Sequence, residues 1–211
     1  MDSIKTYNIE KNTEEIKNEI LKNIIKMLAE RNFINKENID KNIKKLVDKE
    51  SIDLIWELEV DHFVNKDDKI FAIKFISQKI TAVNKALGIS DYLNNYKSNH
   101  KILVVKEISK KAYQYILNNY QNTEVFREDE LLINIVDHIL VPKHEVLTEE
   151  EQNNFFKDYN CTKKNMPKIL STDPIARYYN MQPGQICRII RPSETSGYTT
   201  CYRLVVKGFL K

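Results

Sequence analysis

The chain has 211 residues, of which 42% are hydrophobic and 30% charged, a composition that excludes a disordered protein. Its net charge of +3 is too small to indicate indiscriminate binding to nucleic acid. No apolar run reaches the roughly 18 to 20 residues of a membrane span and no secretory signal pattern is visible, so we expect a soluble, intracellular protein. The three cysteines form no CxxC pair, which predicts neither a disulfide framework nor a zinc site.

Two parts of the chain differ in composition, and we place the boundary between residues 137 and 138. Residues 138–211 contain 11 Lys and Arg against 7 Asp and Glu, whereas residues 1–137 contain 22 against 23. The second part also contains all five prolines and three of the four glycines. Such a shift predicts two domains, the first built from long regular elements and the second rich in tight turns.

The first part shows helical periods of apolar residues that alternate with the two-residue period of strands. Eight elements are expected, namely helices over 16–28 and 39–47, strands over 52–60 and 69–77 joined by a turn at 65–68, a helix over 78–87, a strand over 101–106, a helix over 109–119 and a strand over 123–126. The first two strands form a hairpin. The whole order predicts an α/β domain with helices packed on a central sheet.

Three acidic residues alternate along the first expected strand, Glu57, Glu59 and Asp61, and Lys74 lies on the next strand. The pattern resembles the acidic pair and lysine of restriction-type nucleases. One hypothesis for the function of the chain, kept as the alternative to the one reached below, is therefore a stand-alone nucleic-acid-processing enzyme with a nuclease-like N-terminal domain. Such sites need an acid two residues before the lysine to hold Mg²⁺, and that position is Ala72. We interpret the acids as the solvated face of an antiparallel strand.

No other motif of the sequence indicates catalysis. The chain contains no Gly-rich phosphate loop, no GxSxG and no set of His, Cys and Asp that indicates a nucleophile. His62 and His100 have neither a Cys nor a second His at ligand spacing. We therefore expect no catalytic residue, no bound cofactor and no metal site.

Local signals are denser in the second part. Thr148 and Glu151 form a capping box that predicts a helix starting at residue 149. Asp173 predicts the cap of a short helix whose first residue is Pro174, where a missing N–H costs nothing. Asn180 is expected to end that helix in a left-handed conformation. A β-hairpin then follows, with a type II turn at 183–184, a strand over 185–191, a loop over 192–197 and a strand over 198–206.

The hairpin carries arginines at 188, 191 and 203 in a chain whose positive charge is mostly lysine. Arginine forks bind phosphate or carboxylate, but this loop has only Gly197 to let a backbone close on phosphate, and Glu194 would repel an anion. A second interpretation has the loop hydroxyls bond the loop backbone while the arginines cover strand edges. We favour a surface for docking on another protein, because arginine is enriched at interfaces.

Three motifs, "ILVPKHEVLTEEE", "MPKILSTDP" and "DPIARYYNMQPGQICRIIRPSETSGYTTCYRLV", follow one another in uninterrupted order within a stretch from about residue 139 to residue 206. They closely resemble the C-terminal domain of the fifth-largest subunit of eukaryotic RNA polymerases, which has an equivalent among the small subunits of archaeal polymerases. The positions that match the motif, and that the resemblance implies as a subunit interface, are Pro142, Lys143, His144, Asp173, Pro174, Arg177, Tyr178, Gly184, Arg188, Arg191, Pro192, Ser193, Glu194, Thr195, Tyr202 and Arg203.

The resemblance implies an α+β chain that is a non-catalytic subunit of a multisubunit DNA-dependent RNA polymerase. Residues 1–137 would form a jaw-like α/β domain near downstream DNA, and residues 138–211 a small α+β assembly domain that ends in a β-hairpin. The implied partners are the largest polymerase subunit and other subunits, with no membrane and no small-molecule substrate. The implied location is the nucleus for a cellular polymerase, or the virion or a cytoplasmic viral factory for a viral one.

Overall fold

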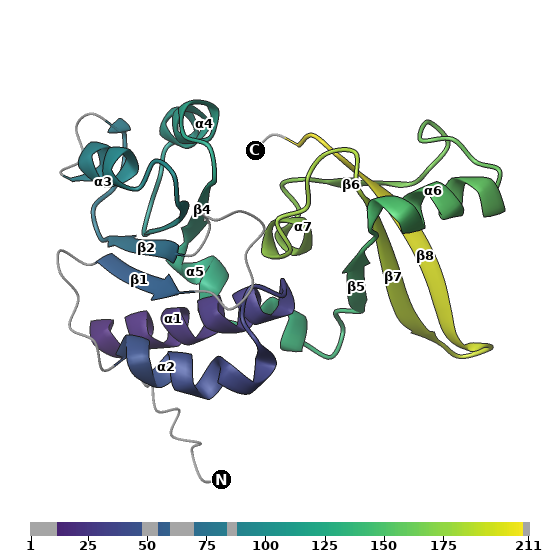
Figure 1. The fold of residues 1–211 in the computed structure, drawn as a ribbon, viewed down its shortest axis with the longest axis horizontal. Coiled ribbons are helices and arrows are strands. Elements are labelled where there is room, and N and C mark those ends of the chain that lie inside the picture. Colours follow the sequence, from purple (N-terminus) through teal and green to yellow (C-terminus); the bar gives the residue numbers. More distant parts are fainter. Residues whose placement is uncertain (1–11, 48–54, 60–69, 84–87, 209–211) are drawn as a thin grey trace, which may run out of the picture. The chain divides into compact units, whose positions relative to one another are not determined.

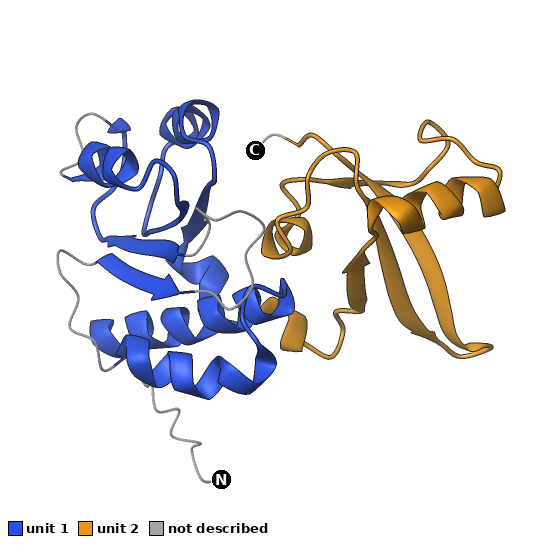
Figure 2. Cartoon of the chain, viewed as in Figure 1, with its two compact units in different colours: residues 1–133 blue, residues 134–211 orange. Residues whose placement is uncertain are grey.

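The computed structural model describes residues 12–47, 55–59, 70–83 and 88–208. The chain divides into two compact units, Met1–Ile133 (unit 1) and Asn134–Lys211 (unit 2), shown in Figure 2. Helices combine with one four-stranded sheet in each unit, so the predicted α+β class is confirmed. No helix in the described ranges is both long enough and apolar enough to cross a membrane.

The sheet of unit 1 is mixed, with its strands in sequence order. Its strands are β1 (Ile55–Glu59), β2 (Ile70–Ile76), β3 (His100–Val105) and β4 (Thr123–Arg127). The strands β1 and β2 pair antiparallel, as the expected hairpin requires, and β2, β3 and β4 are parallel. Parallel neighbours need crossover connections, which here contain helices on one face of the sheet.

Helices cover both faces of this sheet (Figure 1). The helices α1 (Thr13–Glu30) and α2 (Ile39–Val47) lie on one face, and α3 (Ile89–Asn95) and α4 (Lys110–Asn119) lie on the other. A 3₁₀ turn, η1 (Lys36–Asn38), precedes α2, and a short helix, α5 (Glu128–Leu131), follows β4. The helices expected over 16–28, 39–47 and 109–119 are therefore confirmed.

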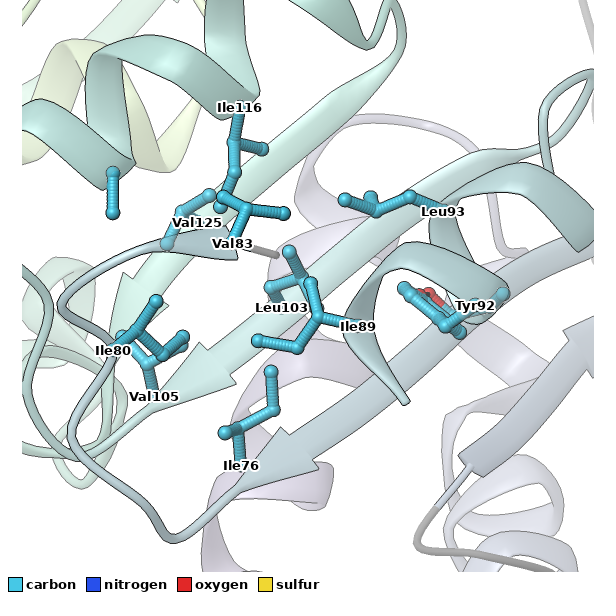
Figure 3. Packing of buried hydrophobic residues seen from close by; sticks show 12 residues of the cluster. Ile76, Ile80, Val83, Ile89, Tyr92, Leu93, Leu103, Val105, Ile116 and Val125 are labelled. Carbon is cyan, nitrogen blue, oxygen red and sulfur yellow. Dashed lines mark hydrogen bonds between the residues drawn. The ribbon is translucent and has the colours of Figure 1, made fainter. Parts of the chain in front are cut away.

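An apolar cluster fills the space between α3, α4 and the sheet (Figure 3). Ile76, Leu103 and Val125 come from three neighbouring strands and meet Leu93 of α3 and Ile116 of α4. Each of these five side chains is at least nine-tenths buried. Burial of such side chains contributes about 1.5 to 3 kcal/mol each, which is what holds the crossover helices on the sheet.

Polar contacts join α1 to α5, and Arg31, the residue after α1, to β4. The buried Asn23 amide donates to the carbonyls of Leu131 (2.8 Å) and Leu132 (3.1 Å) at the end of α5. The Arg31 guanidinium binds both carboxylate oxygens of Glu124 on β4 at 2.7 and 2.8 Å, and the Arg31 side chain is 4% exposed. A buried bidentate pair fixes geometry because either partner alone would leave a desolvated charge.

The helix expected over 78–87 is wrong for residues 78–83, which are largely irregular. Ile80 forms a β-bridge with Ile108, and both Ile80 and Val83 are buried in the cluster of Figure 3. Their apolar spacing therefore reflects burial of an irregular segment. Helix α3 begins later, at Ile89, after Gly88 with a φ of 73°. Residues 84–87, the turn expected at 65–68, and residues 52–54, 60 and 69 of the expected hairpin strands lie outside the described residues.

The sheet of unit 2 has the strand order β5-β7-β8-β6. Its strands are β5 (Lys143–Val146), β6 (Lys168–Leu170), β7 (Ile186–Ser193) and β8 (Gly197–Val206). The expected hairpin is confirmed as β7 and β8, with β5 antiparallel to β7 and β6 parallel to β8. The strands β5 and β6 were not predicted.

Two helices cover opposite faces of this sheet. Helix α6 (Glu149–Asp158) buries Phe155 with Ile186 and Leu204, which share one face. Helix α7 (Pro174–Tyr178) packs with Cys187 and Val205 on the other face, next to the 3₁₀ turn η3 (Ile135–Asp137). Successive strand residues point to opposite faces, so the two apolar clusters lie on either side of the same pair of strands.

The predicted capping signals of unit 2 are confirmed. The Thr148 hydroxyl accepts from the Glu151 backbone N–H (3.3 Å), and the Glu151 carboxylate accepts from the Thr148 N–H (2.8 Å). Asn180 has a φ of 48°, and Gly184 has a φ of 97°, as position three of a type II turn requires. These local signals are predictable because each is satisfied within a few residues.

A buried lysine closes the end of α3. Lys101 is 1% exposed, and its ammonium donates to the carbonyls of Tyr96 (3.0 Å), Asn99 (3.0 Å) and Lys97 (3.4 Å). The Tyr96 carbonyl is that of the C-cap of α3, and the carbonyls of Lys97 and Asn99 belong to the turn that follows. Lys101 of the neighbouring strand β3 therefore supplies hydrogen-bond donors to the C-cap and to this turn.

We therefore expect Lys101→Met to lower the free energy of unfolding by about 1 to 3 kcal/mol, because it removes three hydrogen bonds while keeping most of the side-chain volume. Urea denaturation measures the change. The matched control is Lys97→Met on the exposed side chain of the same turn, which we expect to be nearly neutral. Equal midpoints for the two variants would show that Lys101 does not cap α3.

We also expect unit 2 to stay folded when the chain is cut near the start of that unit, at Leu140. Ile139 and Leu140 are 94% and 82% exposed, which makes the segment an accessible protease site. Limited chymotrypsin treatment should cut near Leu140 and leave a folded fragment that extends to residue 211, as measured by mass spectrometry and circular dichroism. The expected domain boundary is wrong if the halves unfold in one transition that no cleavage divides.

Candidate protein interface

The residues singled out on α7 mainly build the helix itself. Asp173 Oδ1 accepts from the Ile175 backbone N–H at 2.9 Å, and Pro174 occupies the first helical position. Tyr178 is buried and Arg177 is half-buried. Of these four predicted residues only the Pro174 ring is exposed, so their first role is to set where α7 begins and how it packs.

The strand β5 and the residue before it form a second group. The His144 ring is buried, and its Nδ1 lies 2.7 Å from the Pro142 carbonyl oxygen. Burial lowers the pKa of His144, an effect that the charge of Asp173 opposes and that of Arg203 reinforces. Lys143 is exposed and Pro142 is half-buried. His144 is thus a neutral core residue, and Lys143 is the member of this group that faces solvent.

Arg188 is engaged by carboxylates of its own unit. Its guanidinium binds Glu145 Oε2 through Nε (2.8 Å) and Nη2 (2.6 Å), and Nη2 lies 3.7 Å from Glu151. Lys143 Nζ lies 2.6 Å from the other Glu145 oxygen. Hydrogen bonds from Lys143 and Arg188 lower the pKa of Glu145, which keeps it ionised. Arg188 therefore ties β7 to β5 and to the start of α6.

Aromatic rings surround Tyr202 on the same face of the sheet. The Tyr202 ring centre lies 4.5 Å from that of Phe155 and 5.6 Å from that of Tyr159. Burial and a hydrogen bond with Tyr159 raise the pKa of Tyr202. Tyr159 is 61% exposed and was not singled out from the sequence, although its spacing of four from Phe155 places both on one side of α6.

Five predicted residues lie at the tip of the hairpin, and all but one are exposed. Arg191, Pro192, Glu194 and Thr195 are exposed, and the Ser193 hydroxyl lies 3.3 Å from that of Thr195. Arg191 pairs with Thr199 of β8 through its backbone. The side chains of Arg191 and Glu194 make neither a hydrogen bond nor an ion pair with any residue that the structure describes. Ser193 is half-buried.

The remaining tip residues complete the hairpin. Gly197 ends the loop with a φ of 72°, the left-handed value that lets a three-residue loop close. Gly184 lies at the other end of β7, in the turn before that strand, so it is a structural residue. Tyr198 follows the loop and is 74% exposed, and it was missed as a surface residue.

The sheet separates these residues into two surfaces. Paired residues of β7 and β8 share a face, and the pairs alternate between faces. The surface that we call the aromatic face carries Tyr198 and Tyr202, together with Tyr159, the residue after α6. The other, the arginine face, carries Arg191 and Arg203, which are both exposed. The sixteen predicted residues therefore do not form a single patch.

Unit 1 does not assemble the nuclease arrangement in the residues described. The Glu57 carboxylate accepts from the Tyr96 hydroxyl at 2.5 Å and raises the pKa of that tyrosine to about 12. Lys74 Nζ lies 5.5 Å from the ring centre of Tyr92, and Ala72 is the cross-strand partner of Glu57. Among the described residues no group of three or more His, Cys, Asp or Glu could hold a metal ion.

Among known proteins, one family model matches unit 2, and two relatives match residues of both units. Residues 133–205 match the family described as RNA polymerase Rpb5, C-terminal domain. The chain is 36% identical to DNA-directed RNA polymerase subunit 5 of Acanthamoeba polyphaga mimivirus over 190 residues, 89% of this chain and 90% of the relative. It is 32% identical to the subunit rpabc1 of DNA-directed RNA polymerases I, II, and III of Dictyostelium discoideum over 196 residues, 89% and 96% of the two chains.

An archaeal relative matches a shorter stretch. DNA-directed RNA polymerase subunit Rpo5 of Methanocaldococcus jannaschii is 41% identical over 76 residues, which are 36% of this chain and 97% of the relative. The viral and the Dictyostelium relatives, by contrast, align along about nine tenths of each chain at more than 30% identity. The resemblance seen in the sequence is thus confirmed, and the chain belongs to the subunit 5 family of DNA-directed RNA polymerases.

Proposed function

We propose that the chain is a non-catalytic subunit of a multisubunit DNA-dependent RNA polymerase and that unit 2 docks it on the largest subunit. The observation that carries this is full-length similarity to polymerase subunits from a virus and a eukaryote. The arrangement of unit 2 supports it. Apart from Lys143 and Pro174, the exposed predicted residues lie on the β7–β8 hairpin, and what they offer is contact area for another protein.

Unit 2 is the natural docking module. The family match covers residues 133–205, almost all of this unit. The archaeal relative shows that a polymerase subunit can consist of little more than a segment of this length. If unit 2 docks the chain, unit 1 has a separate role, which such short subunits lack.

The hairpin tip is the part of unit 2 best suited to docking. The side chains of Arg191 and Glu194 are exposed and form no hydrogen bond or ion pair with the residues described, whereas the Arg188 side chain binds Glu145. At an interface, an arginine can replace its bound water with an acidic group of the partner, and a neighbouring glutamate can do the same with a basic group. We therefore assign the docking contacts to Arg191 and Glu194, with Pro192 and Thr195 as their exposed neighbours.

Unit 1 is proposed as a jaw that lies near downstream DNA while the polymerase transcribes. Its support is that the viral and Dictyostelium relatives align across both units. The place of action follows from the polymerase, being the nucleus for a cellular enzyme and the virion or viral factory for a viral one. Both settings have a relative, one in a virus and one in a eukaryote.

We expect Arg191→Ala and Glu194→Ala to melt nearly as the wild type does but to be recovered poorly with the largest subunit. Exposed ion pairs contribute only about 0 to 1 kcal/mol to a fold. Truncating an arginine at the centre of an interface costs about 2 kcal/mol or more of binding. The measurements are the melting temperature of each variant alone and its co-purification with the other polymerase subunits.

Lys163→Ala, on an exposed lysine far from the hairpin in the sequence, is the matched control and should leave both measurements unchanged. Suppose instead that Arg191→Ala and Glu194→Ala lose several degrees of stability yet assemble normally whenever folded. These residues would then stabilise the hairpin, and the docking assignment would be wrong.

For the jaw, we expect the full-length chain to crosslink to DNA ahead of the transcribing polymerase through residues of unit 1. Photoreactive bases placed at successive positions of the template, followed by protease mapping of the labelled chain, locate the contact. Crosslinks confined to residues 134–211, or absent at every downstream position, would exclude the jaw role while leaving docking through unit 2 intact.

A further inference from the structure

The strand β8 has a stretch of unpaired backbone along its outer edge. The Val205 N–H donates to the Gln185 carbonyl (2.8 Å) on the β7 side. Backbone groups alternate in direction along an antiparallel strand, so the even-numbered residues of β8 point away from β7. The Leu204 N–H accordingly donates outward to the Pro167 carbonyl (2.8 Å), and the Val206 carbonyl accepts from the Ser171 N–H (2.8 Å). Strand β6 thus closes this end of the edge.

The loop closes the other end of the same edge. The Tyr198 N–H donates to the Ser196 carbonyl (2.8 Å), and the Ser196 hydroxyl donates to the Tyr198 carbonyl (3.2 Å). Between the two closed ends lie Thr200 and Tyr202. Within residues 88–208, no hydrogen bond involves their backbone N–H and C=O groups. We call these two residues the open edge.

The opposite edge of the hairpin is protected. Strand β5 pairs with β7 from Cys187 to Ile190. The next residue of β7 that points outward is Pro192, which has no N–H to donate. Proteins commonly blunt an exposed strand edge with proline, lysine or a covering segment. The open edge of β8 has neither proline nor lysine at residues 198–203.

The side chains beside the open edge indicate what kind of strand fits there. On the aromatic face, Tyr198 is 74% exposed, and Tyr202 contacts Tyr159, which is 61% exposed. On the arginine face, Arg191 and Arg203 are exposed and form no ion pair with the residues described. An added strand alternates its side chains between these faces. The complementary segment therefore has apolar or aromatic residues on one side and a carboxylate on the other.

We propose that an extended segment of the polymerase's largest subunit adds as a strand to the open edge of β8. Its backbone bonds the N–H and C=O groups of Thr200 and Tyr202, and its acidic side chain meets Arg203. The inference rests on the docking proposed above and specifies its mode, in which main-chain bonds give affinity and alternating side chains give selectivity.

A proline at position 200 tests this directly. Thr200 faces Ile190 at a pair that exchanges no hydrogen bonds with β7, so Thr200→Pro removes only an outward N–H and blocks the approach of a strand. Pro192 shows that this hairpin accepts proline at such a pair. We expect Thr200→Pro to melt nearly as the wild type and to bind the cognate largest subunit at least about tenfold more weakly. The control, Thr200→Ala, keeps the N–H and should bind normally.

Hydrogen exchange of the full-length wild-type chain gives a second measurement that needs no variant to fold. The amides of Thr200 and Tyr202 should exchange quickly in the isolated chain and at least about tenfold more slowly in the complex. The amides of Cys201 and Arg203, which point toward β7, serve as the internal reference and should be slow in both.

The possible outcomes distinguish a failure of strand addition from a failure of the proposed docking. If the wild type binds the largest subunit while Thr200 and Tyr202 stay in fast exchange, strand addition is wrong and the docking proposal stands. If the wild type is never recovered with the largest subunit, both fail. A wild-type chain that dimerises alone, and loses the dimer on Thr200→Pro, would replace the proposed occupant by a second copy of the chain.

Discussion

The antiparallel pairing of β7 with β8 is the constraint on which the rest of unit 2 depends. It fixes which residues share a face, and a shift of one residue would exchange the two faces of one strand. In the observed register Cys187 and Val205 lie under α7, while Ile186 and Leu204 lie under α6. Beyond these layers the pair runs on without helices, so the same register that builds two cores also delivers two exposed surfaces to the tip.

Much of the fold follows from local sequence, and the failures have physical causes. The helices α1, α2 and α4 could be predicted because the apolar residues of each recur at helical spacing. The short strands β5 and β6 could not, because four and three residues show no period and gain their bonds from β7 and β8 far along the chain. The helix predicted around Ile80 was wrong because buried residues of an irregular segment can show the same spacing as those of a helix.

The candidate interface was predictable as a set of residues but not as an arrangement. Similarity of motif gives no means of separating residues that build the unit from residues that face a partner. Arg188 and Arg191 look alike in sequence, yet β5 places Glu145 beside the first and leaves the second exposed. Tyr159 and Tyr198 were missed because exposure is a property of the assembled sheet. Backbone groups of an open edge leave even less trace, since every residue other than proline carries them.

The strand order of unit 2 also constrains how it folds during synthesis. The central strands β7 and β8 are the last of its four strands to leave the ribosome, although they are the template on which the others pair. The outer strands β5 and β6 are made first and have no pairing partner until the hairpin emerges. The hairpin itself is local and closes quickly, whereas β5 and β6 then join it across long intervening segments. Unit 2 therefore acquires its sheet from the centre outward, in the reverse of the order in which its strands are synthesised.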